Sequence, residues 1–182
     1  MPPRIDHVIS TAVKYLKLYR VASPPVDIWG ILDHMRIPVL SGNLHGLDGT
    51  CYPYIRKDGK VRFYVLVDDG THFNRTRIRY TLTHEFAHIV LNHHFDHSLR
   101  RPEKDQEAEV FAAHFLMPEY MFATVGPEVL TPKGLYELVT RFDVSWATML
   151  RRLEELGIQS VEQSQRILDN RTSLRRQKED IL

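Results

Sequence analysis

The segment from 76 to 94 constrains the fold of this chain most, and we predict that it forms one long helix. It contains the motif His84-Glu85-Phe86-Ala87-His88. On a helix, residues four apart lie one turn apart on one face, so both imidazoles can reach the same ion. Large apolar residues, among them Leu82 and Phe86, occupy the opposite side. The pattern therefore predicts a helix whose apolar side is buried and whose histidines face a metal site.

The two histidines and the glutamate between them have distinct roles in such a site. His84 and His88 are the predicted zinc ligands, and Glu85 can reach a water in the remaining coordination position. Zinc lowers the pKa of that water to about 7 in favourable sites, and a neighbouring carboxylate can pass its proton to a leaving amine. The same five-residue pattern also arises by chance on surface helices, but a solvated helix has no need of a buried apolar side. We therefore predict Glu85 as the catalytic residue and zinc as the cofactor.

A catalytic zinc usually has three protein ligands, and His94 is one candidate for the third. That solution requires the helix to break near Leu91 so that His94 folds back. Leucine is a good helix former, and in an uninterrupted helix the His94 side chain points away from the first histidine. We therefore favour a ligand from another segment.

A carboxylate from the next helix, predicted at 103–117, is the preferred third ligand. On this helix Asp105 and Glu109 share a face with two alanines, while Glu107 points to the opposite side. We predict Asp105 as the third ligand and Glu109 as the group that holds a ligand histidine by its second ring nitrogen. Glu107 and Glu109 are the fallback ligands. The alternative is a solvated acidic face near a helix N-terminus, where acidic residues are favoured.

The remaining periodicities predict an α+β fold, mostly helical, with a small antiparallel or mixed sheet beside the histidine helix. The additional helices are expected at 5–20, 26–35, 133–142 and 145–156, and the strands at 37–40, 50–56 and 61–67. The strand at 61–67 is either an exposed edge that binds an extended substrate or an ordinary core strand. We divide the chain into a metallopeptidase-like domain at 1–130, a helical segment at 131–158 and a charged tail at 159–182.

The segment at 131–158 has the pattern of a helix-turn-helix, with Ser145 capping its second helix. It raises two alternatives to a peptidase: a DNA-binding regulator with a structural zinc, or a sensor whose metal site is not catalytic. The four basic and four acidic residues of the segment cancel, whereas DNA binding depends strongly on phosphate neutralisation. Structural zinc also favours four ligands, usually including cysteines. We therefore expect a packing or docking element and no nucleic-acid partner.

Composition narrows the setting further. The formal net charge of +1 supplies no field that would gather nucleic acid or an anionic membrane. No apolar run approaches the roughly 18 residues that span a bilayer, and the N-terminus does not resemble a signal peptide. Cys51 is the only cysteine, so an internal disulfide is impossible. These features predict a cytoplasmic protein without a membrane partner.

Several stretches resemble the ImmA/IrrE family of metallopeptidases. They are Arg79-Tyr80-Thr81-Leu82-Thr83-His84-Glu85-Phe86-Ala87-His88, the segment 107–118 from Glu107 to Pro118, and Phe142-Asp143-Val144-Ser145 leading to Leu150 through Gly157. Shorter likenesses occur at 24–27 and 37–39. Together they cover about residues 5–158 and are more specific than the histidine motif alone.

The resemblance implies a gluzincin-like fold, zinc on His84 and His88, and Glu85 as general base. Family members typically place a glutamate as third ligand where this chain has Asp105, whose side chain is one methylene shorter. They cleave transcriptional repressors or antitoxins. The resemblance therefore implies an endopeptidase whose protein partner is a helix-turn-helix repressor or an antitoxin.

Overall fold

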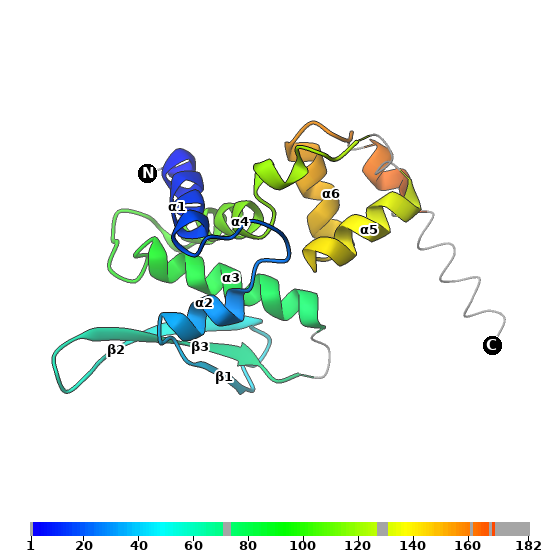
Figure 1. The fold of residues 1–182 in the computed structure, drawn as a ribbon. Coiled ribbons are helices and arrows are strands. Elements are labelled where there is room, and N and C mark those ends of the chain that lie inside the picture. The colour runs from blue at the N-terminus through cyan, green and yellow to red at the C-terminus, as the bar shows by residue number, and fades with distance from the viewer. Residues whose placement is uncertain (1, 71–73, 127–130, 161, 168, 170–182) are drawn as a thin grey trace.

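The structure, a computed structural model, describes residues 2–70, 74–126, 131–160, 162–167 and 169. Its α+β architecture is mostly helical, with a small sheet on one side of the central helix α3 (Figure 1). The elements in chain order are α1 (Ile5–Leu18), α2 (Ile28–His34), β1 (Val39–Gly42), β2 (Gly49–Ile55), β3 (Val61–Asp68), α3 (Arg75–Val90), α4 (Arg101–Leu116), the 3-10 helix η1 (Glu119–Phe122), α5 (Pro132–Phe142) and α6 (Trp146–Glu155).

The sheet has the strand order β1-β3-β2, with β1 parallel and β2 antiparallel to β3. Val65 at the centre of β3 pairs with Val39 on one side and with Cys51 on the other. The strand predicted at 61–67 is therefore the central strand, and the idea that it forms an exposed edge is wrong. Within the described part of the chain, the outer side of β2 has no strand partner.

Helix α3 forms the middle layer of the molecule. Asn74 caps its start by accepting a hydrogen bond from the Arg77 backbone N–H. Its apolar side is buried, and the Phe86 ring meets those of Phe111 and Phe115 from α4 at centroid distances of 5.8 and 5.6 Å. In Figure 1 the sheet lies on one side of α3, with α4 and α1 on the other. This packing confirms the predicted burial of the helix and places its histidine face at the edge of the sheet.

Helix α3 ends at Val90 rather than continuing to residue 94 as predicted. Asn92 adopts the left-handed conformation, with φ of 60°. The Asn92 N–H donates to the Ile89 carbonyl, and the His93 N–H donates to the His88 carbonyl. These two bonds form a Schellman motif, in which asparagine is a common substitute for glycine. The helix stops here because the motif satisfies its last carbonyl groups and reverses the chain.

Helices α5 and α6 pack together as a pair, and Ser145 caps α6 by accepting from the Thr148 N–H. Two buried arginines fasten the pair to the rest of the chain. Arg79 of α3 donates to the Asp143 carbonyl at 3.0 Å, and Arg152 of α6 donates to the Met117 carbonyl at 3.0 Å. None of the described helices combines the length and the apolar character that crossing a membrane requires.

Two of the predicted boundaries fall at or beyond the limits of the described residues. The junction proposed at 130/131 adjoins 127–130, and most of the predicted charged tail lies at 170–182, both outside the described residues. The start of the tail is helical at 162–167, and Ile167 belongs to the hydrophobic core. The tail is thus not solvated throughout.

Candidate metal centre

Three potential ligand atoms meet at the histidine face of α3. The Nε2 atoms of His84 and His88 lie 3.1 Å apart, and His88 Nε2 lies 3.5 Å from Asp105 Oδ1. Donor atoms of these three residues all lie within 4.8 Å of one another. Zinc bonds of about 2.0–2.1 Å at tetrahedral angles place neighbouring donors about 3.4 Å apart. The spacing and the donor set, two imidazoles and one carboxylate, therefore fit a zinc ion with one position left open.

Burial keeps the two histidines in the form that binds metal. It lowers the pKa of His84, and it lowers that of His88 to about 3, with the charges of neighbouring histidines contributing. Both imidazoles are consequently neutral near pH 7, and each has one ring nitrogen with a free lone pair for a metal ion. The Asp105 side chain is 45% exposed, so this carboxylate lies toward solvent while the histidines are more enclosed.

Glu85 is buried between α3 and the first residues of β2, and only 8% of its surface is exposed. Burial is the main cause of its raised pKa, which makes the carboxylate a better proton acceptor than an ordinary glutamate. Gly49 lets the strand approach here, because a Cβ on this residue would lie 3.5 Å from Glu85 Cγ and under 3.0 Å from Thr81 Cγ2. The close contact between strand and helix holds Glu85 beside the ligand cluster.

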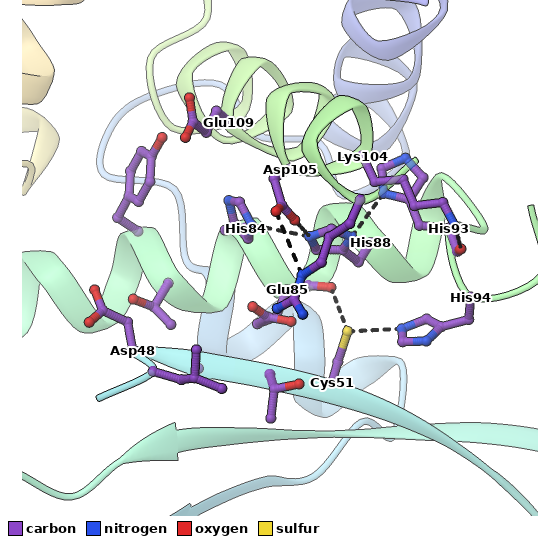
Figure 2. Close-up of a pocket in the computed structure, with 16 residues that line it drawn as sticks. Asp48, Cys51, His84, Glu85, His88, His93, His94, Lys104, Asp105 and Glu109 are labelled. Carbon is purple, nitrogen blue, oxygen red and sulfur yellow. Dashed lines mark hydrogen bonds and ion pairs between the residues drawn. The ribbon is translucent and has the colours of Figure 1, made fainter. Parts of the chain in front are cut away.

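A cavity of about 680 Å³ opens over the cluster, and Figure 2 shows side chains from α3, α4 and β2 converging on it. It is lined by Leu47, Asp48, Gly49, Thr50, Cys51, Tyr80, Thr81, His84, Glu85, His88, His93, His94, Arg101, Lys104, Asp105 and Glu109. A second cavity of about 440 Å³ between α4 and α6 shares Tyr80 and Glu109 with the first. The metal centre therefore lies in an open cleft that continues toward the C-terminal helices.

The two fallback carboxylates lie in different places, and neither belongs to the ligand cluster. Glu109 is exposed and lines the cleft, but among the described residues no hydrogen bond joins it to His84 or His88. Glu107 is fully buried on another side of α4, where it meets Arg4 and His93. The group that contacts the second ring nitrogen of a ligand histidine is thus His93 and not Glu109.

The Schellman turn at Asn92 directs two consecutive histidines to different partners. His93 Nδ1 lies 2.9 Å from His88 Nδ1, whereas His94 Nε2 lies 3.1 Å from the buried Cys51 thiol. His94 does fold back, contrary to the reasoning from an uninterrupted helix, yet it is not among the clustered ligands. Sequence reasoning missed His93, and the signal that would have found it is the asparagine that follows Leu91, a frequent helix terminator.

Three further polar residues differ in whether they line the cleft. His97 and Tyr120 do not line the cleft, and the Tyr120 hydroxyl donates to the Val21 carbonyl. Tyr80, one turn before His84 on α3, does line it. Burial is the main cause that raises the pKa of Tyr80 to about 12, so its phenol remains a hydrogen-bond donor at neutral pH.

Comparison with solved structures shows a similar fold in a Mycobacterium tuberculosis transcriptional regulator. The two share 16% sequence identity with a TM-score of 0.55, and the match covers 81% of this chain. It covers 47% of the regulator, so the chain spans about half the length of that protein. A search of curated proteins found no significant match.

The family comparison matches residues 56–154 to the IrrE N-terminal-like domain. The matched region is more than half of the chain and contains α3, α4 and all three clustered ligand residues. The geometry of the site and the sequence match therefore point to the same class of protein. The chain belongs to the IrrE N-terminal-like family, which is a family of zinc-type metallopeptidases.

Proposed function

We propose that this protein is a zinc-dependent endopeptidase in which His84, His88 and Asp105 hold the ion and Glu85 is the general base. The proposal rests on the spacing of three ligand atoms in an open cleft. His88 Nε2 lies 3.1 Å from His84 Nε2 and 3.5 Å from Asp105 Oδ1. Asp105 comes from α4, so its shorter side chain is compensated by close packing of α4 on α3, which the small buried residues Ala108 and Ala112 permit.

Zinc, when bound, supplies Lewis-acid activation of a water nucleophile and of the substrate carbonyl. Glu85 accepts the proton of the attacking water, for which its raised pKa suits it, and then donates that proton to the leaving amine. Tyr80 lines the cleft as a protonated phenol and is positioned to donate a hydrogen bond to negative charge on the carbonyl oxygen. The chain thus contains a base and a donor for peptide hydrolysis.

The start of β2 offers a binding edge for an extended polypeptide. Gly49 and Cys51 belong to this strand and also line the cleft. The strand pairs with β3 on one side only within the described residues, so its outer backbone groups are available to a substrate strand. A peptide paired with this edge would pass over Glu85 and the ligand cluster.

The substrate that we propose is a helix-turn-helix repressor or an antitoxin. Two considerations support it: the resemblance to ImmA/IrrE peptidases, and the likeness in fold to a protein described as a transcriptional regulator. Direct DNA binding by α6 is disfavoured by the placement of its arginines. Arg152 is buried against Met117 and His114, so Arg151 is the one exposed arginine of this helix.

The experiment compares the wild-type protein with Glu85→Gln during co-expression with helix-turn-helix repressors and antitoxins from the same genome. Mass spectrometry of the repressor reports cleavage, and elemental analysis reports zinc. We expect about one zinc per chain in both forms and a roughly 100- to 10,000-fold slower cleavage by Glu85→Gln. Asp105→Ala should lose zinc, and Glu109→Ala is the matched control that should keep it. Equal cleavage by wild type and Glu85→Gln would remove Glu85 from the mechanism, and equal zinc in all variants would remove the ligand assignment.

A further inference from the structure

A chain of buried polar groups runs from the metal centre to the start of α1. His88 Nδ1 contacts His93 Nδ1 at 2.9 Å, and His93 Nε2 contacts Glu107 Oε2 at 3.0 Å. Arg4 completes the chain by donating to both oxygens of Glu107. We propose that His93, held by Glu107 and Arg4, is a positioning residue that fixes the ring of His88 for metal binding. The inference rests on the proposed zinc site.

The ligand role of His88 determines which ring nitrogens of His88 and His93 carry a proton. A metal ion on Nε2 requires a free lone pair there, so the proton of neutral His88 is on Nδ1. That N–H donates to His93 Nδ1, which must then be the unprotonated nitrogen of its ring. His93 consequently carries its proton on Nε2 and donates it to Glu107, a carboxylate that can only accept. Each hydrogen bond has one donor and one acceptor, so the chain is satisfied in a single arrangement.

The far end of the chain is fixed firmly enough to orient an imidazole. The side chains of His93 and Glu107 are 2% and 0% exposed. Arg4 donates to Glu107 through its backbone N–H at 2.7 Å, through Nε at 3.0 Å and through Nη2 at 2.9 Å. The remaining Nη1 donates to Asp96 at 2.7 Å, and Lys104 Nζ donates to the His93 carbonyl at 2.6 Å. The turn after α3 is therefore held from both α1 and α4.

The arrangement has a function that backbone geometry alone does not supply. The Schellman motif fixes where the backbone of His93 lies, but it does not determine the side-chain torsion angles of His88. A hydrogen bond to His88 Nδ1 removes that freedom and points Nε2 toward His84 and Asp105. Carboxylates or carbonyls usually serve this purpose directly. Here an imidazole transmits the constraint from a carboxylate in the interior.

The test measures zinc affinity by competition with a chromophoric chelator in wild type, His93→Phe, His93→Gln and His97→Phe. Phenylalanine keeps the bulk of the ring and removes both hydrogen bonds, whereas glutamine keeps an acceptor and a donor. We expect a 10- to 100-fold weaker zinc affinity for His93→Phe, with most of the affinity restored in His93→Gln. His97→Phe changes a nearby histidine that is exposed and does not line the cleft, so it should leave zinc affinity unchanged. Cobalt-substituted His93→Phe should also show shifted visible absorption bands, because the His88 ligand is no longer held.

A second measurement requires no variant. Long-range ¹H–¹⁵N spectra of the zinc-loaded wild type should show His88 protonated on Nδ1 and His93 protonated on Nε2. The opposite tautomer of His93 would overturn the inference, as would unchanged zinc affinity in folded His93→Phe or equal losses in His93→Phe and His93→Gln. Absence of zinc binding by the wild type would overturn the proposed function together with this inference. Zinc binding that is insensitive to His93 would overturn the inference alone.

Discussion

Gly49→Ala is a test of how β2 is held against the catalytic helix. Gly49 begins β2, and a Cβ there would approach the Leu66 carbonyl oxygen to 3.1 Å and Thr81 Cγ2 to under 3.0 Å. Non-bonded carbon atoms do not approach this closely, so the Thr81 side chain or the strand must shift. Because the same Cβ would reach 3.5 Å from Glu85 Cγ, the displacement occurs beside the proposed general base.

The expected cost is about 1–3 kcal/mol of unfolding free energy, the usual range for overpacking a buried contact. Gly42→Ala is the matched control, because a Cβ at this strand residue of β1 meets no atom within 4 Å. It should be neutral or slightly stabilising, since glycine weakens a strand. Thr81→Ser removes the methyl group of closest approach, so it should restore most of the stability lost in Gly49→Ala.

The coupling between Gly49 and Thr81 is measured by urea denaturation of Gly49→Ala, Thr81→Ser and the double variant, followed by circular dichroism. A chelator is included because bound zinc would add its own stabilisation. The reasoning is refuted if Gly49→Ala is as stable as Gly42→Ala. It is also refuted if Thr81→Ser fails to relieve the loss, since the methyl group would then not be the obstacle.

Two further stability predictions concern buried charges. Arg79 and Arg75 both approach Asp143 Oδ2, but their side chains are 2% and 75% exposed. In urea denaturation, Arg79→Met should therefore lower the free energy of unfolding by about 3–5 kcal/mol, and Arg75→Met by no more than about 1 kcal/mol. Equal losses in the two variants would contradict this prediction. Burial raises the pKa of Glu107, but hydrogen bonds from Arg4 outweigh it and lower the pKa to about 2. At pH values above the ordinary pKa of glutamate, the ionised carboxylate therefore contributes roughly 3 kcal/mol to the free energy of unfolding. This contribution is lost as the pH falls toward 2. In chelator, the difference in unfolding free energy between wild type and Glu107→Gln should shrink from about pH 5 to pH 3; a constant difference would show that the charge is not the cause.

Local patterns predicted the elements of the fold well, because their determinants are short in range. The capping residues Asn74 and Ser145 lie next to the helices that they cap, and the spacing of apolar residues within α3 defines its buried side. The role of the strand at 61–67 could not be settled in this way. Its position between β1 and β2 depends on pairing with strands elsewhere in the chain, and a buried central strand has the same composition as a half-buried edge.

The site shows the same limit. The meeting of His84, His88 and Asp105 was anticipated because helical spacing determines the first two and the shared face of α4 suggests the third. The role of Glu107 was not anticipated, because its partner Arg4 lies 103 residues earlier in the chain. In the sequence, Glu107 cannot be told from a solvated acid of the same helix, and only the tertiary arrangement brings it to Arg4 and His93.

The turn at Asn92 has a consequence for how proteins with this architecture could diverge. Two adjacent imidazoles leave the turn in different directions: His93 contacts Glu107 in the interior, and His94 points toward Cys51 on β2, as Figure 2 shows for the second pair. Both residues are histidines, so the length of the turn, and not their identity, sets which imidazole contacts His88. Deleting one residue before His93 would move His94 to the position that faces Glu107 and would leave the Cys51 thiol without its imidazole. Changes in loop length at this point would alter the chemistry of the site while every ligand residue stayed in place.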